Sequence, residues 1–403
     1  MLRPNTLALT AMLAFLTALG PLATDMYLPS LPAIGRLLGA STAEVQLTLS
    51  VFLCGFAVGQ IIYGPLSDRH GRKPVLIATL VLFAAASAVC AAAPTIETLI
   101  AARFLQALAG SGPVVLARSV VRDLYEGARA GRELSLMGMI LGVVPTAAPI
   151  LGGGVQATLG WRANFVLPVL AGLVLALVVW RRLPETLRQR APERISPRAM
   201  LEIYAGLTRH GAFRAYLALT TLTYAGLFAW ISASSFVLQD LYGLSEFAFG
   251  IAFALACLGY VLGALTATRL ILRLGLDRTV GYGVTCLAGG GMLMVLTLAS
   301  GFGSAVTLVA TMTVYLFGVG LGFQASIAGA LTPFPDRAGA ASSLVGFTQM
   351  TLAALVGIAV GHALGESAWP LAATVALMGV SALAVWAATR KVRRAGVPEK
   401  ART

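Results

Sequence analysis

Asp25 is the residue of this chain whose type and position point most directly to chemistry. It lies near the end of the apolar stretch NTLALTAMLAFLTALGPLATDMYLPSLPAI, and no neighbour in the sequence neutralises it. An ionised group inside hydrocarbon costs at least ~2.5 kcal/mol, so such residues are rare, face polar cavities and carry function. The other 15 of the 16 acidic residues fall in loops or at the expected ends of apolar segments. A lone membrane carboxylate predicts a protonatable switch of the kind that transporters use.

The composition places most of the chain in a membrane. Hydrophobic residues make up 58% and charged residues 11% of the 403 residues, and the mean hydropathy is +0.85. A soluble chain of this length needs far more polar surface. One span needs ~20 mostly apolar residues, and twelve such segments can be counted. They lie at 6–30, 44–65, 75–94, 97–117, 133–156, 163–183, 213–238, 246–268, 279–300, 304–328, 338–363 and 369–390.

The basic residues are concentrated in alternate loops between the apolar segments. A net charge of +13 would suggest nucleic-acid binding in a soluble protein, but here Arg and Lys cluster in alternate loops, such as Arg69, Arg72 and Lys73 after the second span. The opposite loops hold only Arg36 and Arg162. Because basic loops stay on the cytoplasmic side, we expect both termini in the cytoplasm, basic loops against anionic lipid headgroups, and no nucleic-acid partner.

One long polar segment, RRLPETLRQRAPERISP (181–197), divides the chain into halves of six spans each. The loop GPLSDRHGRKP (64–74) after the second span has a weak counterpart, TRLILRLGLDR (268–278), after the eighth. Two pseudo-repeated six-helix bundles form a known transporter plan, and the alternative is twelve spans without a repeat. We expect an all-α membrane protein with a first bundle at 1–183, a cytoplasmic linker at 184–212, a second bundle at 213–390 and a basic cytoplasmic tail at 391–403.

The loop 64–74 has a composition suited to gating. A Gly-Pro pair is expected to end the helix there, and Asp68 then begins a tight basic turn. A carboxylate paired with arginines would hold the inner ends of two helices together in one state and release them in another. The alternative is a basic loop that only sets topology. The candidate gating residues are Gly64, Asp68, Arg69, Gly71 and Arg72.

The order of residues in this loop resembles the signature loop of the major facilitator superfamily. Other segments are similar to the superfamily's fourth-span motif, to the fifth-span motif of its antiporters, and to its Bcr/CflA branch. They are RFLQALAGSG (103–112), GVVPTAAPILGGG (142–154) and, for the branch, TDMYLPSLP (24–32), VRDLY (121–125) and SAWP (367–370). That branch includes bicyclomycin and chloramphenicol resistance exporters. The resemblance implies multidrug efflux by drug:proton antiport, as a multi-pass protein of the bacterial inner membrane.

Arg103 lies within the fourth apolar run, and a buried guanidinium needs partners. Asp25 is the expected partner if the first and fourth spans line one cavity, so Asp25 and Arg103 form the candidate proton-coupling pair. Arg103 could instead reach the outer headgroups or pair with Glu97. Gln106, one turn further along, is placed to orient Arg103 or a substrate.

The fifth span is rich in proline and glycine. Proline bends a helix, and small residues allow helices to approach closely. The candidate antiporter seal is therefore Pro145, Pro149, Gly152, Gly153 and Gly154. The alternative is ordinary membrane packing, since both residue types are common in such helices.

Aromatic and amide side chains are the candidates for substrate contact. Aromatic walls suit apolar or weakly cationic amphipathic molecules, and lipid contact or core packing is the alternative for each residue. The candidates are Met26, Tyr27, Gln106, Tyr224, Phe228, Trp230 and Gln349.

No signature of catalysis is present. The chain has no Walker sequence and no nucleophile elbow. Its three histidines are dispersed, and its four cysteines are scattered over apolar spans. We therefore expect no enzyme activity, no metal site and no cofactor other than coupling protons. The expected partners are a small amphipathic substrate and the lipid bilayer, with the chain as a monomer. A proton-coupled exporter or importer of an endogenous metabolite remains the alternative function.

The charge asymmetry of the loops predicts the topology. Cysteine labelling or reporter fusions should place 68–73 and 185–210 in the cytoplasm, because both segments are basic. Labelling of either segment from the outside of intact cells would reject this arrangement.

Overall fold

The computed structural model describes residues 6–125, 127–187, 197–334, 337–365 and 367–395, and some side chains in the range 127–142 and at a few helix ends are outside this description. All regular structure in these ranges is helical. The first half contains α1 (Leu7–Asp25), η1 (Leu28–Ser30), α2 (Leu31–Leu38), α3 (Thr42–His70), α4 (Arg72–Ala92), α5 (Ile96–Leu124), α6 (Gly127–Leu159) and α7 (Ala163–Arg182). The second half contains α8 (Pro197–Arg209), α9 (Gly211–Phe236), η2 (Val237–Leu241), α10 (Glu246–Leu274), α11 (Leu276–Ala299), α12 (Ala305–Leu331), α13 (Ala338–Ala363), α14 (Trp369–Ala388) and α15 (Arg390–Ala395).

Each of the twelve expected spans falls on one of these helices. Among the described residues, eleven helical segments are long and apolar enough to cross a membrane. The remaining span, predicted at 133–156, falls on α6, which is 33 residues long and whose described apolar part is Val143–Leu159. The expected fold class, an all-α membrane protein with twelve transmembrane helices, is confirmed.

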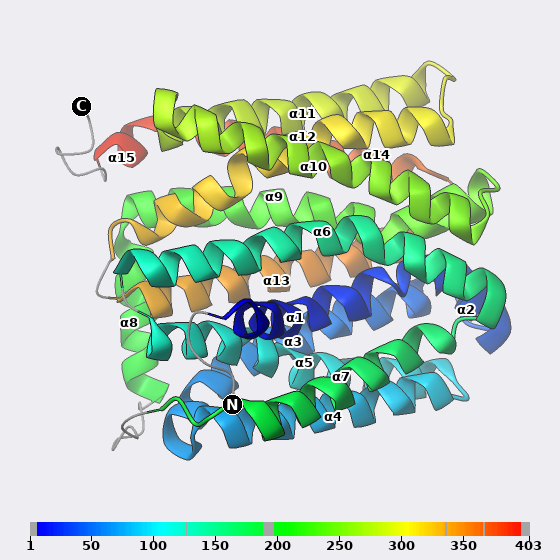
Figure 1. Ribbon diagram of the computed structural model, residues 1–403. Helices are drawn as coiled ribbons and strands as arrows, with labels where there is room; N and C mark the ends of the chain where they lie inside the picture. The colour runs from blue at the N-terminus through cyan, green and yellow to red at the C-terminus, as the bar shows by residue number, and fades with distance from the viewer. Residues whose placement is uncertain (1–5, 126, 188–196, 335–336, 366, 396–403) are drawn as a thin grey trace. The chain divides into compact units, whose positions relative to one another are not determined.

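The contacts between residues divide the chain into two compact units. The first comprises 1–195 together with 245–251, and the second comprises 196–244 and 252–403. The main division falls within the predicted linker 184–212, part of which forms α8. In the first unit α3 and α4 pack on α5, α4 lies beside α7, and α1 lies beside α6 (Figure 1). In the second unit α11 packs on α12 and α14, and α9 packs on α12, α13 and α14.

The Gly-Pro pair at 64–65 does not end its helix, so that prediction was wrong. The α3 helix continues to His70 with Pro65 inside it. Pro65 removes the backbone donor that the carbonyl of Ile61 would otherwise receive, and the helix continues for another five residues without that bond. In the same turn the hydroxyl of Ser67 donates to the carbonyl of Gly64 at 2.8 Å. Gly71 ends the helix instead, with φ at +102°, a conformation that glycine adopts readily.

The α6 helix runs through Pro145 and Pro149 and packs through its glycines. A Cβ atom added at Gly152 would overlap the backbone of Met26, and one added at Gly153 would overlap the carbonyl oxygen of Glu246. Glu246 lies in the 245–251 segment, which belongs to the same unit as α6. Gly154, by contrast, has only a ring atom of Phe247 at 4.0 Å from its added Cβ.

These glycines give a matched pair of substitutions. Gly153→Ala should lower the unfolding free energy by ~1–3 kcal/mol, because overpacking against fixed backbone forces a shift. Gly154→Ala should have no comparable cost, since the site has room. Thermal unfolding of the two purified variants in detergent measures the difference, and equal midpoints would show that α6 does not need close contact at Gly153.

Candidate functional site

Two prolines interrupt the backbone ladder next to Asp25. Pro29 and Pro32 cannot donate to the carbonyls four residues earlier, so α1 ends at Asp25 and the chain continues through η1 into α2. The segment Met26–Ser30, which we call the η1 segment, is buried throughout. Asp25 itself is 6% exposed, and none of the described residues forms a hydrogen bond or ion pair with its carboxylate.

Arg103 is fully buried in α5 and is not paired with a carboxylate. Its Nη1 atom donates to the Oε1 atom of Gln106 at 2.7 Å and to the carbonyl of Ala23 at 3.1 Å. Its Nε and Nη2 atoms have no partner among the described residues. The expected contact with Asp25, like the alternative contact with Glu97, is therefore absent from this conformation, because the side chain turns toward its own helix and the end of α1.

Aromatic rings pack against the guanidinium group of Arg103. The guanidinium carbon lies 4.7 Å from the ring centre of Tyr27 and 4.2 Å from that of Phe52, a cation–π arrangement. Tyr27 also packs on Phe165, with 5.1 Å between ring centres, and its hydroxyl lies 2.9 Å from the hydroxyl of Thr48. Tyr27 is thus built into the packing of the unit, as is Met26 at 2% exposure.

Gln106 has the orienting contact that the sequence predicted. Its Oε1 atom accepts from Arg103, and its Nε2 atom donates to the hydroxyl of Ser87 on α4 at 2.8 Å. Ser87 in turn donates to the carbonyl of Phe83 at 2.7 Å. This chain of bonds fixes both the amide and the guanidinium that it holds.

Asp25 is not the only buried carboxylate of the first unit. Glu133, which sequence analysis placed at the end of a span, lies inside α6 and is 9% exposed. The hydroxyl of Thr10 on α1 donates to its Oε2 atom at 2.7 Å. The reason for the difference is that α6 begins at Gly127, about two turns before Glu133.

The remaining substrate candidates lie in the second unit. Tyr224 stacks on Phe323 with 5.8 Å between ring centres, and Trp230 stacks on Phe253 at 6.2 Å. Phe228 and Trp230 are buried in this conformation, and the indole nitrogen of Trp230 has no partner among the described residues. Gln349, on α13, is 9% exposed with an unpartnered Oε1 atom.

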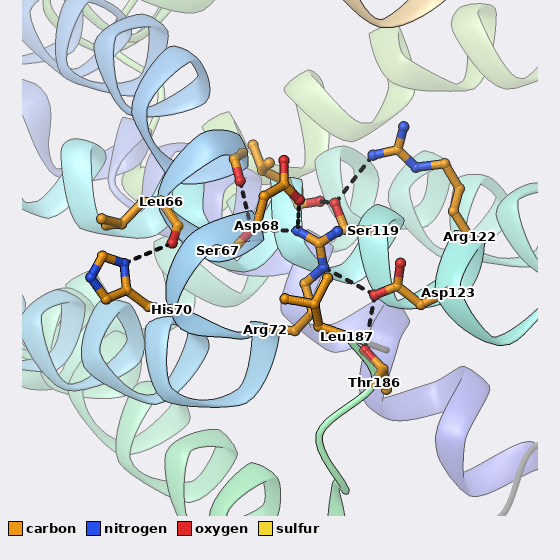
Figure 2. Close-up of polar contacts among 12 residues, drawn as sticks. Leu66, Ser67, Asp68, His70, Arg72, Ser119, Arg122, Asp123, Thr186 and Leu187 are labelled. Atoms are coloured by element: carbon orange, nitrogen blue, oxygen red, sulfur yellow. Dashed lines mark hydrogen bonds and ion pairs between the residues drawn. The ribbon is translucent and has the colours of Figure 1, made fainter. Parts of the chain in front are cut away.

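At the other end of the first unit, Arg72 is the centre of a charge network (Figure 2). Its Nη1 atom contacts Asp68 at 2.5 Å and donates to the Ser67 hydroxyl at 2.6 Å. Its Nε atom donates to the Oδ2 atom of Asp123 at 3.0 Å, and the hydroxyl of Thr186 donates to that same oxygen at 3.1 Å. The network joins the end of α3, the start of α4, the end of α5 and the segment after α7.

Glu185 caps the start of α4. Its two carboxylate oxygens accept from the backbone N–H groups of Arg72 at 2.9 Å and Lys73 at 3.1 Å. Oε1 also accepts from the N–H groups of Thr186 at 2.9 Å and Leu187 at 3.0 Å. A negative charge at a helix amino terminus is favourable because it satisfies orphan donors and the helix dipole. A Cβ atom at Gly71 would lie 2.5 Å from Glu185, so glycine is required there for space as well.

Three of the five predicted gating residues belong to this network: Asp68, Gly71 and Arg72. Arg69 is exposed and bonds none of the described residues, and Gly64 contributes only its carbonyl. Sequence analysis missed Glu185 and Thr186, although the polar stretch that contains them was visible, and it assigned no role to Asp123.

In the counterpart loop of the second unit, the residue at the centre of the contacts is an acid, Asp277. Gly275, with φ at +80°, precedes α11, and the Oδ1 atom of Asp277 accepts from the Nε atom of Arg393 at 2.6 Å. Arg393 also donates to the carbonyl of Trp386 at 2.6 Å and to Thr389, while the Tyr216 hydroxyl donates to Asp277 at 3.3 Å. Arg393, expected in a basic tail, is instead a buried residue of α15.

The sequence matches the Major Facilitator Superfamily over residues 13–358. The chain belongs to this superfamily. Multidrug resistance protein D of Escherichia coli is 32% identical over 87% of each chain. The bicyclomycin resistance protein homolog of Haemophilus influenzae is 30% identical over 94% of this chain and 95% of its own. The major facilitator fold is also that of the xylose transporter XylE from E. coli, with a TM-score of 0.73, 14% identity and coverage of 94% and 96%. The resemblance to the branch of drug-resistance exporters is therefore confirmed, and the chain is a transporter rather than an enzyme.

The cap on α4 can be tested directly. Glu185→Ala should lower the unfolding free energy by ~1–3 kcal/mol, because backbone donors at the start of α4 lose their acceptor. Glu185→Gln, which keeps one acceptor oxygen, should fall between that variant and the parent. Thr158→Ala, which removes an exposed hydroxyl bonded only to its own helix, is the control and should stay within ~0.5 kcal/mol. Thermal unfolding in detergent gives the order, and a Glu185→Ala protein as stable as the control would contradict the cap.

Proposed function

We propose that this transporter is a drug:proton antiporter of the bacterial inner membrane, with both termini in the cytoplasm. The observation that carries the proposal is the arrangement around Asp25. A buried carboxylate lies at the end of α1, and a buried Arg103 with two unused donor atoms holds that same end of the helix through Ala23. Buried ionisable groups of this kind in membrane proteins mark ion pathways.

Protonation of Asp25 and its contact with Arg103 are alternatives. Burial of an ionised carboxylate without a partner is costly, so the arrangement seen here suits the neutral acid. An ionised Asp25 would be stabilised by the Nε or Nη2 donors of Arg103. Two protonation states therefore favour two arrangements of the end of α1, which is what a coupled transporter needs.

The Arg72 network is proposed to support alternation rather than to bind substrate. It joins α3, α4, α5 and the segment after α7 within one unit, and each described carboxylate in it has a cation or backbone donors as partners. Helix ends that are fixed to one another move together, so a change near Asp25 can shift the unit as a body.

The substrate is proposed to be an uncharged or weakly cationic amphipathic molecule, and more than one such molecule. Tyr224 on α9 is half-buried, and Phe228 and Trp230, which are buried here, would add apolar surface in a conformation that exposes them. With the Gln349 amide, such a wall makes few fixed polar contacts, which favours broad recognition. The relatives named for resistance to multiple drugs and to bicyclomycin support this substrate class.

Asp25→Asn should abolish uphill export and proton exchange, because the amide cannot bind or release a proton. Export of ethidium, an amphipathic fluorescent cation, and of chloramphenicol, an uncharged drug, is measured in proton-driven everted vesicles. Proton release on drug addition is measured with a pH dye on purified protein. Asp25→Glu should keep part of the activity, and Glu97→Gln, at an exposed carboxylate without a described partner, is the control with parental activity.

An Asp25→Asn protein that still releases protons and still exports against a gradient would refute the assignment of the coupling site. Glu133 would then be the next residue to replace, because it is the other buried carboxylate among the described residues of the unit. Transport of neither probe by the parent protein would count against drug export and favour a metabolite as substrate.

A further inference from the structure

The η1 segment, directly after Asp25, is seated on α6 without space between the two backbones. Gly152 lies against the carbonyl group of Met26, and any side chain there would overlap it. The next residue, Gly153, lies against the carbonyl oxygen of Glu246 at the start of α10. The same turn of α6 therefore touches the residue after the proton-coupling candidate and the 245–251 segment of the unit.

One side-chain amide joins the η1 segment to this turn. Asn164, on α7, is 2% exposed, and its Nδ2 atom donates to the Ser30 hydroxyl at 2.9 Å and to the carbonyl of Gly152 at 3.1 Å. The orientation of the amide follows from chemistry, because a backbone carbonyl can only accept and must therefore face the NH2 group. Three elements, η1, α6 and α7, thus share a single NH2 group.

The carbonyl oxygen of the Asn164 amide accepts no hydrogen bond from the described residues. The Oδ1 atom of Asn164 is buried and has no partner among the described residues. A buried acceptor without a donor is costly. If Asn164 served only to hold α7 against its neighbours, we would expect both its NH2 group and its Oδ1 atom to be hydrogen-bonded. An open acceptor beside a segment that must change state is instead available to a donor in the other state.

We propose that Asn164 is a positioning residue that transmits the protonation state of Asp25 to the antiporter helix α6. When proton binding moves the η1 segment, the two hydrogen bonds of the Asn164 amide move the Gly152 backbone with it. The contact of Gly153 with Glu246 then displaces the start of α10. This inference rests on the proposed proton coupling at Asp25. Asn164 does not itself exchange the proton or touch the drug.

Two substitutions remove the link without removing the packing around it. Asn164→Leu deletes both hydrogen bonds at similar volume, and Asn164→Asp keeps the shape but presents a carboxylate, when ionised, to the Gly152 carbonyl. The neighbouring contact of Phe165 with Tyr27, 5.1 Å between ring centres, still seats the η1 segment on α7, so we expect both variants to fold. Thr158→Val, at an exposed hydroxyl of α6, is the control.

The measurement is the number of protons that leave the lumen per ethidium molecule taken up, in everted vesicles containing the full-length protein. Uncoupling should raise this ratio by roughly tenfold in both Asn164 variants, within the range of ordinary coupling free energies. Ethidium-induced proton release from the purified variants should stay within about twofold of the parent, because Asp25 is intact. The control should show the parental ratio.

A merely structural role predicts a different result. Loss of folded protein lowers proton efflux from the lumen and ethidium uptake in proportion, and an unchanged ratio in folded Asn164→Leu and Asn164→Asp would overturn the proposal. If neither variant folds, Ser30→Ala removes the Ser30 bond alone and must also raise the ratio; a parental ratio there rejects the link.

Asp25→Asn is measured in parallel. Retained coupling in that variant refutes the proton site, whereas loss of coupling there with a parental ratio in the Asn164 variants refutes only the role of Asn164.

Discussion

A buried guanidinium with only part of its donors satisfied is the constraint on which the first unit depends. Arg103 cannot reach water, so it must draw partners to itself. It takes Gln106 from its own helix, the carbonyl of Ala23 from α1, and the faces of Tyr27 and Phe52. These contacts hold the end of α1, which Pro29 and Pro32 define, and the η1 segment in place, and Asp25 lies on the same stretch of backbone.

The charged residue that comes from outside the loop is acidic in the first unit and basic in the second. In the first, the acidic Glu185 from the segment after α7 caps α4, and Arg72 is surrounded by carboxylates. In the second, Arg393 from the helix after α14 binds Asp277 in the first turn of α11. Each solution suits a helix amino terminus, which favours negative charge whether it comes from its own first turn or from another segment. The weak sequence repeat thus conserves the position of a clamp rather than its residues.

The sequence predicted those features of the fold that depend on residues close together in the chain. Apolar runs predicted the spans, because hydropathy is a property of neighbouring residues. The predicted pairing of Asp68 with an arginine is present, but Asp68 lies within α3 and does not begin a turn, so that part of the prediction was wrong. Partners distant in sequence were missed, since nothing local links Arg72 with Glu185 or Asp277 with Arg393. Gly64–Pro65 was misread because one missing backbone donor does not end a 29-residue helix, and α3 continues to His70. The predicted contact between Asp25 and Arg103 is absent from this conformation: the Nη1 atom of the arginine bonds an amide and a backbone carbonyl, and its Nε and Nη2 atoms have no partner among the described residues.

The distribution of unsatisfied buried groups separates the rigid part of the first unit from the part that can change. At the start of α4 both oxygens of Glu185 accept hydrogen bonds from backbone N–H groups, and the Arg72 side chain has three partners. Around Asp25, by contrast, two nitrogens of Arg103 and the Oδ1 atom of Asn164 lack partners among the described residues. Each unmet group costs ~1–3 kcal/mol, and conformers of one protein differ by only a few kcal/mol. A rearrangement that satisfies one of these groups while exposing another is therefore on the scale of a conformational equilibrium, which supports the proposal that the end of α1 changes between two states while the Arg72 network moves with it.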